Sequence, residues 1–147
     1  MKHFYARKGF TLVELFLALA IILIVFAIIM PGGIEFYRSY ALTSERDNLL
    51  SILRKARSLS MGNINEREHG VYVGANDYTL FEGASYAARV SGFDQVYKRA
   101  AGLTTTGPNE IVFRQLDAYT TASGTINISN GTGQSLIRVN NEGRIDW

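Results

Sequence analysis

The chain has no cysteine and only two histidines. Without cysteine there are no disulfide bonds, no thiolate nucleophile and no cysteine-ligated metal. His3 lies close to the N-terminus, and His69 stands near Glu66 and Glu68, where we interpret it as a solvated turn residue. These residues cannot assemble a nucleophile–base pair or a zinc site. We therefore predict that the protein is not an enzyme and that it needs no cofactor or metal.

An excess of charge is also absent from most of the chain. The formal net charge is +2, but three of the fifteen basic residues, Lys2, Arg7 and Lys8, precede residue 10. From residue 31 onward, twelve basic side chains stand against twelve acidic ones. Bulk charge therefore gives no argument for a nucleic acid or another polyanion as the partner.

One long apolar run is present near the N-terminus. From Phe10 to Met30, twenty-one residues include a single charged one, Glu14. A helix of this length rises about 1.5 Å per residue and roughly matches a bilayer core of about 30 Å. An ionised carboxylate in such a span normally has a partner. Cleavage after Gly9 would create a cation on Phe10, one helical turn from Glu14, on the same chain or on a neighbour.

The segment Lys8-Gly9-Phe10-Thr11-Leu12-Val13-Glu14-Leu15 resembles the class III signal of type IV prepilins and type II secretion pseudopilins. The resemblance implies cleavage between Gly9 and Phe10 by a prepilin peptidase, N-methylation of Phe10, and docking of one subunit on the next through Glu14. It also implies other pilin or pseudopilin subunits and an inner-membrane assembly platform as partners. The alternatives are an ordinary secretory signal and a plain one-pass membrane anchor, and neither needs Glu14. The apolar stretch of a secretory signal also spans about 7–15 residues and precedes its cleavage site.

These features predict the organisation of the chain. We interpret residues 1–9 as a leader peptide, residues 10–30 as a transmembrane and filament-core helix, and residues 31–147 as one ectodomain. Basic residues before the span predict a cytoplasmic N-terminus, because basic flanks stay on that side. The protein would cross the lipid bilayer of the cytoplasmic (inner) membrane once, with its C-terminal domain outside, and then enter an extracytoplasmic filament. Pro31 and Gly32 predict a helix kink.

A second helical pattern follows this point, over residues 34–61. Its apolar stripe consists of Leu49, Ile52, Leu53, Ala56, Leu59 and Ser60. This spacing predicts an amphipathic helix that ends at Gly62-Asn63. Thr43 or Ser44 could instead cap a fresh helix start, with Glu45 in its first turn.

Beyond residue 69 the apolar spacing changes to two, which predicts strands. The expected strands are Val71–Val73 and Tyr78–Phe81 as a hairpin, then Glu110–Arg114, Gly124–Ser129, Ser135–Val139 and a short one at Arg144–Trp147. Residues 87–90 and 96–101 fit a strand or a short helix. The predicted class is α+β and pilin-like, with a long N-terminal helix packed on one C-terminal antiparallel sheet over residues 69–147.

A looser resemblance covers about the last quarter of the chain. Ser123–Ile128, Leu136–Val139 and Gly143–Ile145 resemble the C-terminal sheet of the H-type pseudopilins and of minor pilins linked to DNA uptake. It implies a minor-subunit role and marks Arg144 as a candidate DNA contact. Some DNA-uptake members carry a further arginine soon after the Gly-Arg pair, where this chain has Ile145 and Asp146.

We therefore predict a structural subunit of a type IV pilus-like or type II secretion pseudopilus filament, with a role in assembly, protein secretion or DNA uptake. The alternatives are a DNA-binding minor pilin of a competence system and a membrane-tethered exported enzyme. Five tyrosines could support the DNA alternative, because tyrosine rings can stack on the bases of single-stranded nucleic acid. We interpret them instead as cross-strand partners in the sheet; they are Tyr72, Tyr78, Tyr86, Tyr97 and Tyr119.

Overall fold

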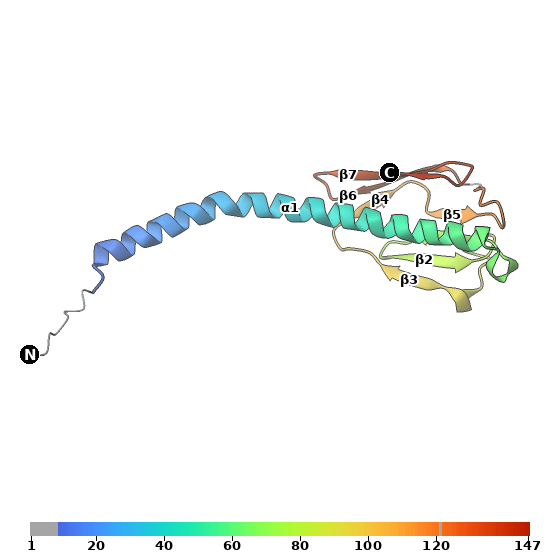
Figure 1. Cartoon of the computed structure of the whole chain (residues 1–147), viewed down its shortest axis with the longest axis horizontal. Helices are drawn as coiled ribbons and strands as arrows, with labels where there is room; N and C mark the ends of the chain where they lie inside the picture. The colour runs from blue at the N-terminus through green and yellow to red at the C-terminus, as the bar shows by residue number, and fades with distance from the viewer. Residues whose placement is uncertain (1–8, 121) are drawn as a thin grey trace, which may run out of the picture. The chain divides into compact units, whose positions relative to one another are not determined.

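The computed structural model describes residues 9–120 and 122–147, with side chains for all of these except residues 30–35. The chain divides into two compact units, Met1–Tyr37 and Arg38–Trp147. The helix α1 (Leu12–Met61) begins in the first unit and ends in the second. All strands of the described residues belong to the second unit, which we call the head (Figure 1).

The long helix predicted from the sequence is confirmed. α1 stays helical through Pro31 and Gly32, and the kink expected there remains a prediction. A fresh helix start at Thr43 or Ser44 is wrong. The neighbouring Leu42 and Glu45 are buried, so packing inside the head holds this stretch in one continuous helix.

Within the head, α1 buries one face. Of the predicted stripe, five side chains are buried and Leu59 is half-buried, because positions three and four apart share a helix face. Charged residues such as Asp47, Arg54 and Lys55 lie on the exposed face. The helix ends as predicted: the N–H of Gly62 donates to the carbonyl of Ser58 at 2.8 Å, and Asn63 takes the left-handed conformation with φ of 51°.

The strands form two antiparallel sheets of four strands each. The first has the order β3-β2-β1-β5, with β1 (His69–Val73), β2 (Asp77–Glu82), β3 (Gln95–Lys98) and β5 (Glu110–Phe113). The second has the order β4-β6-β7-β8, with β4 (Thr104–Thr106), β6 (Gly124–Ser129), β7 (Gln134–Val139) and β8 (Ile145–Asp146). Two short 3-10 helices, η1 (Ile64–Glu66) and η2 (Ser91–Phe93), lie in the connections.

The α+β class is confirmed, and so are the predicted hairpin and the strands that became β5, β6 and β7. The expectation of one sheet is wrong, because the chain passes from β3 to β4 and starts a second sheet. Residues 87–90 are neither strand nor helix. β4 was not predicted: its three threonines carry no apolar alternation, and the strand exists through its pairing with β6.

The core of the head lies between α1 and both sheets. Side chains of α1 such as Leu49 and Leu53 belong to one buried cluster with Tyr78 and Phe113 of the first sheet and Ile126 of the second. In β6 and β7, buried residues alternate with more exposed ones, as expected when a sheet covers a core on one face only. Figure 1 shows α1 running alongside both sheets within the head.

Gly143 fixes the turn between β7 and β8. Its φ is +71°, and a Cβ at this position would lie 2.0 Å from the carbonyl oxygen of the buried Ala118. We expect Gly143→Ala to lower the free energy of unfolding by roughly 2 kcal/mol or more, because strained backbone and steric overlap act together. Denaturant unfolding of the protein in detergent micelles, followed by the emission of Trp147, measures this.

Gly131 provides the matched control. Its φ is +84°, but nothing lies within 4 Å of a Cβ built there. We expect Gly131→Ala to cost about 1 kcal/mol, from backbone strain alone. If Gly143→Ala and Gly131→Ala lowered the free energy of unfolding equally, the contact with Ala118 would make no contribution to stability.

Candidate functional site

The start of α1 carries a reciprocal hydrogen-bonded cap. The backbone N–H and the hydroxyl of Thr11 each donate to Oε2 of Glu14 at 2.8 Å, and the N–H of Glu14 donates to the Thr11 hydroxyl at 3.2 Å. This is a capping box, in which residues three apart satisfy backbone donors that the first helical turn leaves free. The pattern Thr-x-x-Glu is visible in the sequence, although our sequence analysis assigned no role to Thr11.

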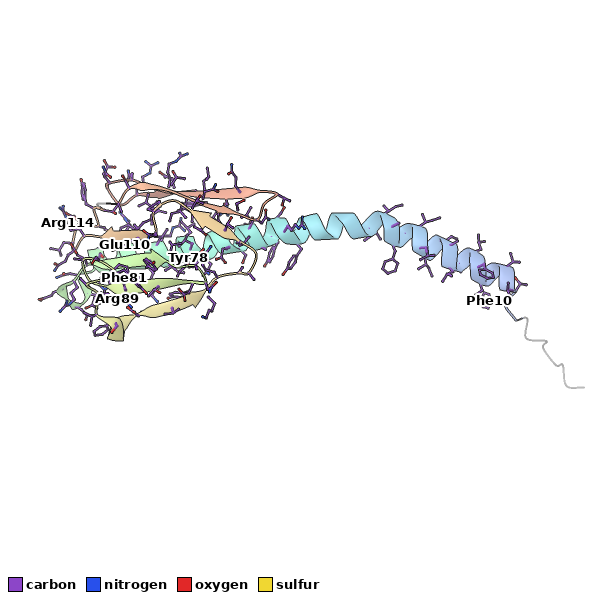
Figure 2. The ribbon with its side chains drawn as sticks, turned by 180° about the vertical axis from the view of Figure 1, so that it is seen from behind. Phe10, Tyr78, Phe81, Arg89, Glu110 and Arg114 are labelled. Atoms are coloured by element: carbon purple, nitrogen blue, oxygen red, sulfur yellow. The ribbon has the colours of Figure 1, made fainter. Side chains whose placement is uncertain are left out.

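The cap also places a negative charge at the positive end of the helix dipole. Both bonds from Thr11 go to one oxygen of the carboxylate, and Oε1 takes part in neither. Phe10, directly before the cap, is 91% exposed, and Glu14 is itself exposed. Figure 2 marks Phe10 at this end of the helix. The carboxylate is therefore held in a defined position with one oxygen available to another group.

After the cap, α1 presents apolar side chains with no protein cover. Among the described residues, Leu12–Ile29 is the one helical stretch long and apolar enough to cross a membrane, judged by length and composition. All of its side chains are exposed in the isolated chain. Such a surface requires lipid or other protein around it.

The other predicted site residues lie elsewhere. Gly9 has nothing within 4 Å of a Cβ built on it, and Pro31 and Gly32 lie inside α1. Arg144 belongs to the head, where its side chain is 72% exposed and its Nε donates to Oδ1 of Asp146 at 2.9 Å. This exposed pair uses only Nε of Arg144, and the terminal nitrogens take no part in it.

The tyrosines do not form an exposed stacking platform. Tyr78 is fully buried and faces Tyr97 in the register of β2 and β3, which confirms cross-strand packing for this pair. Tyr72 and Tyr86 stack on each other with ring centroids 4.0 Å apart. Arg89 lies over the other side of the Tyr86 ring, at 3.8 Å from its centroid. Both faces of Tyr86 are thus occupied within the head.

The Tyr86 ring is part of a cluster on the first sheet. Phe81 meets it edge-on at 5.6 Å, and the N–H of Tyr86 donates to Oε1 of Glu110 at 2.9 Å. Figure 2 shows the labelled residues Phe81, Arg89 and Glu110 close together. Arg89 is held in turn by Asp94, at 2.8 Å from Nε to Oδ2. The cluster fastens residues 83–94 to the sheet and has a structural role.

The interpretation of His69 as a solvated turn residue is wrong. His69 is buried in β1, because pairing with both β2 and β5 places this position inside the first sheet. Burial lowers the pKa of His69, and the nearby Glu82 carboxylate opposes that shift. Glu82 is also buried; its Oε2 accepts a hydrogen bond from Asn65 at 2.7 Å, and Arg67 lies 3.2 Å from Oε1. The group joins η1 to β2.

A second buried ionic group connects α1 with the chain between the two sheets. Glu45 is 4% exposed, and its Oε2 accepts the N–H of Ala100 at 3.1 Å. Nε of Arg99 lies 3.8 Å from Oε1 of Glu45, and its Nη1 donates to the carbonyl of Gly74 at 2.6 Å. Arg99 also donates to the hydroxyl of Thr105. No local sequence signal predicts this contact, because the two charged residues lie far apart in the chain.

The acidic side chains and the histidine of these ionic groups do not gather into a metal site. Within residues 9–120 and 122–147, no cluster of three His, Asp or Glu side chains could hold a metal ion. The geometry with a direct functional meaning is therefore the capped start of α1 and the exposed apolar surface that follows it.

Comparison with known protein families gives a match at the N-terminus. The prokaryotic N-terminal methylation motif matches residues 5–30, which include the cap and the whole apolar span. No curated protein and no solved structure gives a significant match. The motif implies processing by a prepilin peptidase, assembly with other pilin subunits and anchoring in a membrane. Together with the α+β architecture, it supports a type IV pilin or pseudopilin subunit.

Proposed function

We propose that the protein is a structural subunit of a type IV pilus-like or type II secretion pseudopilus filament. It is stored in the inner membrane, loses residues 1–9, is methylated on Phe10 and is then added to the filament at the assembly platform. The observation that carries the proposal is the Thr11–Glu14 cap at the start of an exposed apolar helix that matches the methylation motif.

Docking follows from the positions of two charges. Cleavage after Gly9 places an ammonium group on Phe10, next to Thr11, while Oε1 of Glu14 is not used by the cap. In the filament, the apolar helices of neighbouring subunits surround each other, and opposite charges attract strongly in that low-dielectric interior. The Phe10 ammonium of one subunit therefore pairs with Glu14 of the next, and this pair sets the axial register.

Within this family, the H-type minor pseudopilins are the subtype that the second sheet favours. Its strands β6 and β7 overlap most of two segments whose pattern resembles that subtype, and β8 begins at the last residue of the third, Ile145. A DNA-uptake role would require Arg144 to bind phosphate. Its bond to Asp146 gives no support to that alternative.

Mass spectrometry of filaments sheared from the producing cells tests the proposal. We expect the subunit to begin at Phe10 and to carry one additional methyl group on its terminal nitrogen. The unprocessed chain, recovered from the membranes of cells that lack the peptidase, serves as the reference. Assembled filaments in which residues 1–9 are still attached would refute the docking mechanism, because no Phe10 ammonium would then exist.

A further inference from the structure

The head contains an open groove lined by arginines from two distant parts of the chain. It has a volume of about 800 Å³ and lies between the C-terminal end of α1 and the turn that leads into β8. The helix contributes Arg54, Arg57 and Met61, and the turn and strand contribute Arg144 and Ile145. Because about 90 residues separate the two segments, the fold alone brings these guanidinium groups together.

Two of the three arginines have no anionic partner within the part of the chain that the structure describes. Arg54 lies with its guanidinium over the ring of Trp147, at 4.2 Å from the centroid. This stacking uses the face of the guanidinium and leaves its N–H edge for a ligand. Nε of Arg57 is buried and makes no hydrogen bond to a described residue. The described residues therefore leave this donor unused.

The third arginine and its surroundings limit the charge that the groove can accept. Arg144 uses Nε on Asp146, which leaves its terminal nitrogens for a ligand. Glu142 also lines the groove, and it accepts a hydrogen bond from Nδ2 of Asn140 at 2.9 Å. With acidic groups at its edge, the groove suits one or two carboxylates better than a nucleic-acid backbone, which requires a continuous row of cations.

Trp147 extends the surface beyond the groove. It is 61% exposed and also lines a second hollow of about 200 Å³, together with Leu136, Arg138 and Asp146. Tryptophan, arginine and methionine are the residue types that are enriched in the energetic centres of protein interfaces. Trp147 thus contacts the guanidinium of Arg54 and also lines a hollow with apolar and charged side chains.

From these contacts we propose that this surface binds a segment of another protein in which carboxylate and apolar side chains alternate. The carboxylates pair with Arg54, Arg57 and Arg144, and the apolar side chains pack on Met61 and Trp147. The inference does not depend on the N-terminal motif, since all of these residues belong to the head.

The full-length protein in detergent micelles provides a direct test, because Trp147 is the only tryptophan of the chain. The probe is a hexapeptide of alternating glutamate and leucine, and micelles without protein give the background. We expect a saturable change in Trp147 emission. Arg57→Gln and Arg144→Gln should each weaken binding roughly tenfold, as expected for one charge-assisted contact. Lys98→Gln, which removes an exposed cation of β3 outside the groove, should leave it unchanged.

Two other probes separate the competing explanations. A hexapeptide of alternating glutamine and leucine should bind at least tenfold more weakly if carboxylates are recognised. Equal binding of the two peptides, or no saturable change with the glutamate peptide, would overturn the proposal. The third probe is a twelve-nucleotide oligothymidylate. If it binds more tightly than the glutamate peptide, and if its binding is weakened by the same arginine substitutions, the ligand is a nucleic acid and the proposal is wrong. Circular dichroism of each variant shows whether the head remains folded. If Arg57→Gln does not fold, the binding measured with Arg144→Gln alone still tests the proposal.

Discussion

Glu14→Val is expected to leave the protein in the membrane and to remove it from filaments. Valine makes the span more apolar, so insertion is retained. The same change removes the only carboxylate between Phe10 and Met30, and with it the partner for the Phe10 ammonium of a neighbouring subunit. We expect the amount recovered in sheared filaments to fall at least roughly tenfold, because a buried ammonium without a counter-charge opposes assembly. Immunoblots of membrane and filament fractions measure both outcomes.

Thr11→Val separates docking from capping. It removes the hydroxyl, which donates to Oε2 of Glu14 and accepts the N–H of Glu14. It keeps the carboxylate and the bond from the Thr11 N–H to Oε2. We expect Thr11→Val to assemble better than Glu14→Val, since the charge pair survives. If the two variants were equally defective, the loss would come from the helix start and not from docking. Normal incorporation of Glu14→Val would exclude the proposed role of the carboxylate.

Glu45→Leu is expected to destabilise the head by about 3–5 kcal/mol, the typical result of removing one partner from a buried ion pair. The substitution leaves the guanidinium of Arg99 buried without its carboxylate, and it removes the acceptor for the N–H of Ala100. The loss should appear as a lower denaturant midpoint of the protein in micelles, followed by Trp147 emission. This probe reports on the head, to which Trp147 belongs.

Asp47→Leu is the control for this prediction. Asp47 lies on the outer face of the same helix and pairs with Arg46 at 2.7 Å, with a side chain that is 56% exposed. A surface pair of this kind contributes about 0–1 kcal/mol, so the midpoint should change little. The double variant Glu45→Leu with Arg99→Leu should recover part of the lost stability, because no buried charge remains. An equal midpoint shift for Glu45→Leu and Asp47→Leu would show that burial of the pair has no energetic weight.

Local patterns in the sequence were sufficient for most of the fold. The apolar stripe of α1 and the alternation in β6 and β7 each arise within one segment, so a single segment predicts them. β4 has no such pattern, because pairing with β6 decides its conformation. The division into two sheets is likewise a matter of which strands pair. Buried polar residues such as His69 and Glu82 were misjudged or missed, since polar side chains give no periodic signal of burial.

The candidate sites differ in the same way. Phe10, Thr11 and Glu14 are close in sequence, so their spacing alone indicates a helical turn and a specific chemistry. The arginine groove depends on Gly143, whose turn brings Arg144 to the end of α1. Residues about 90 positions apart come together only in the folded chain, and no motif within either segment predicts that they line one groove.

Along the chain, the boundary between the two units precedes the first residue of the hydrophobic core. The first residue of the described core is Leu42, four positions after the head begins at Arg38. Nδ2 of Asn130 donates to the carbonyl of Arg38 at 3.0 Å, which ties the turn between β6 and β7 to the head's first residue. A truncated protein that starts at Arg38 would lack the apolar span and keep every described residue of the hydrophobic core. It is therefore the form to choose for crystallisation without detergent.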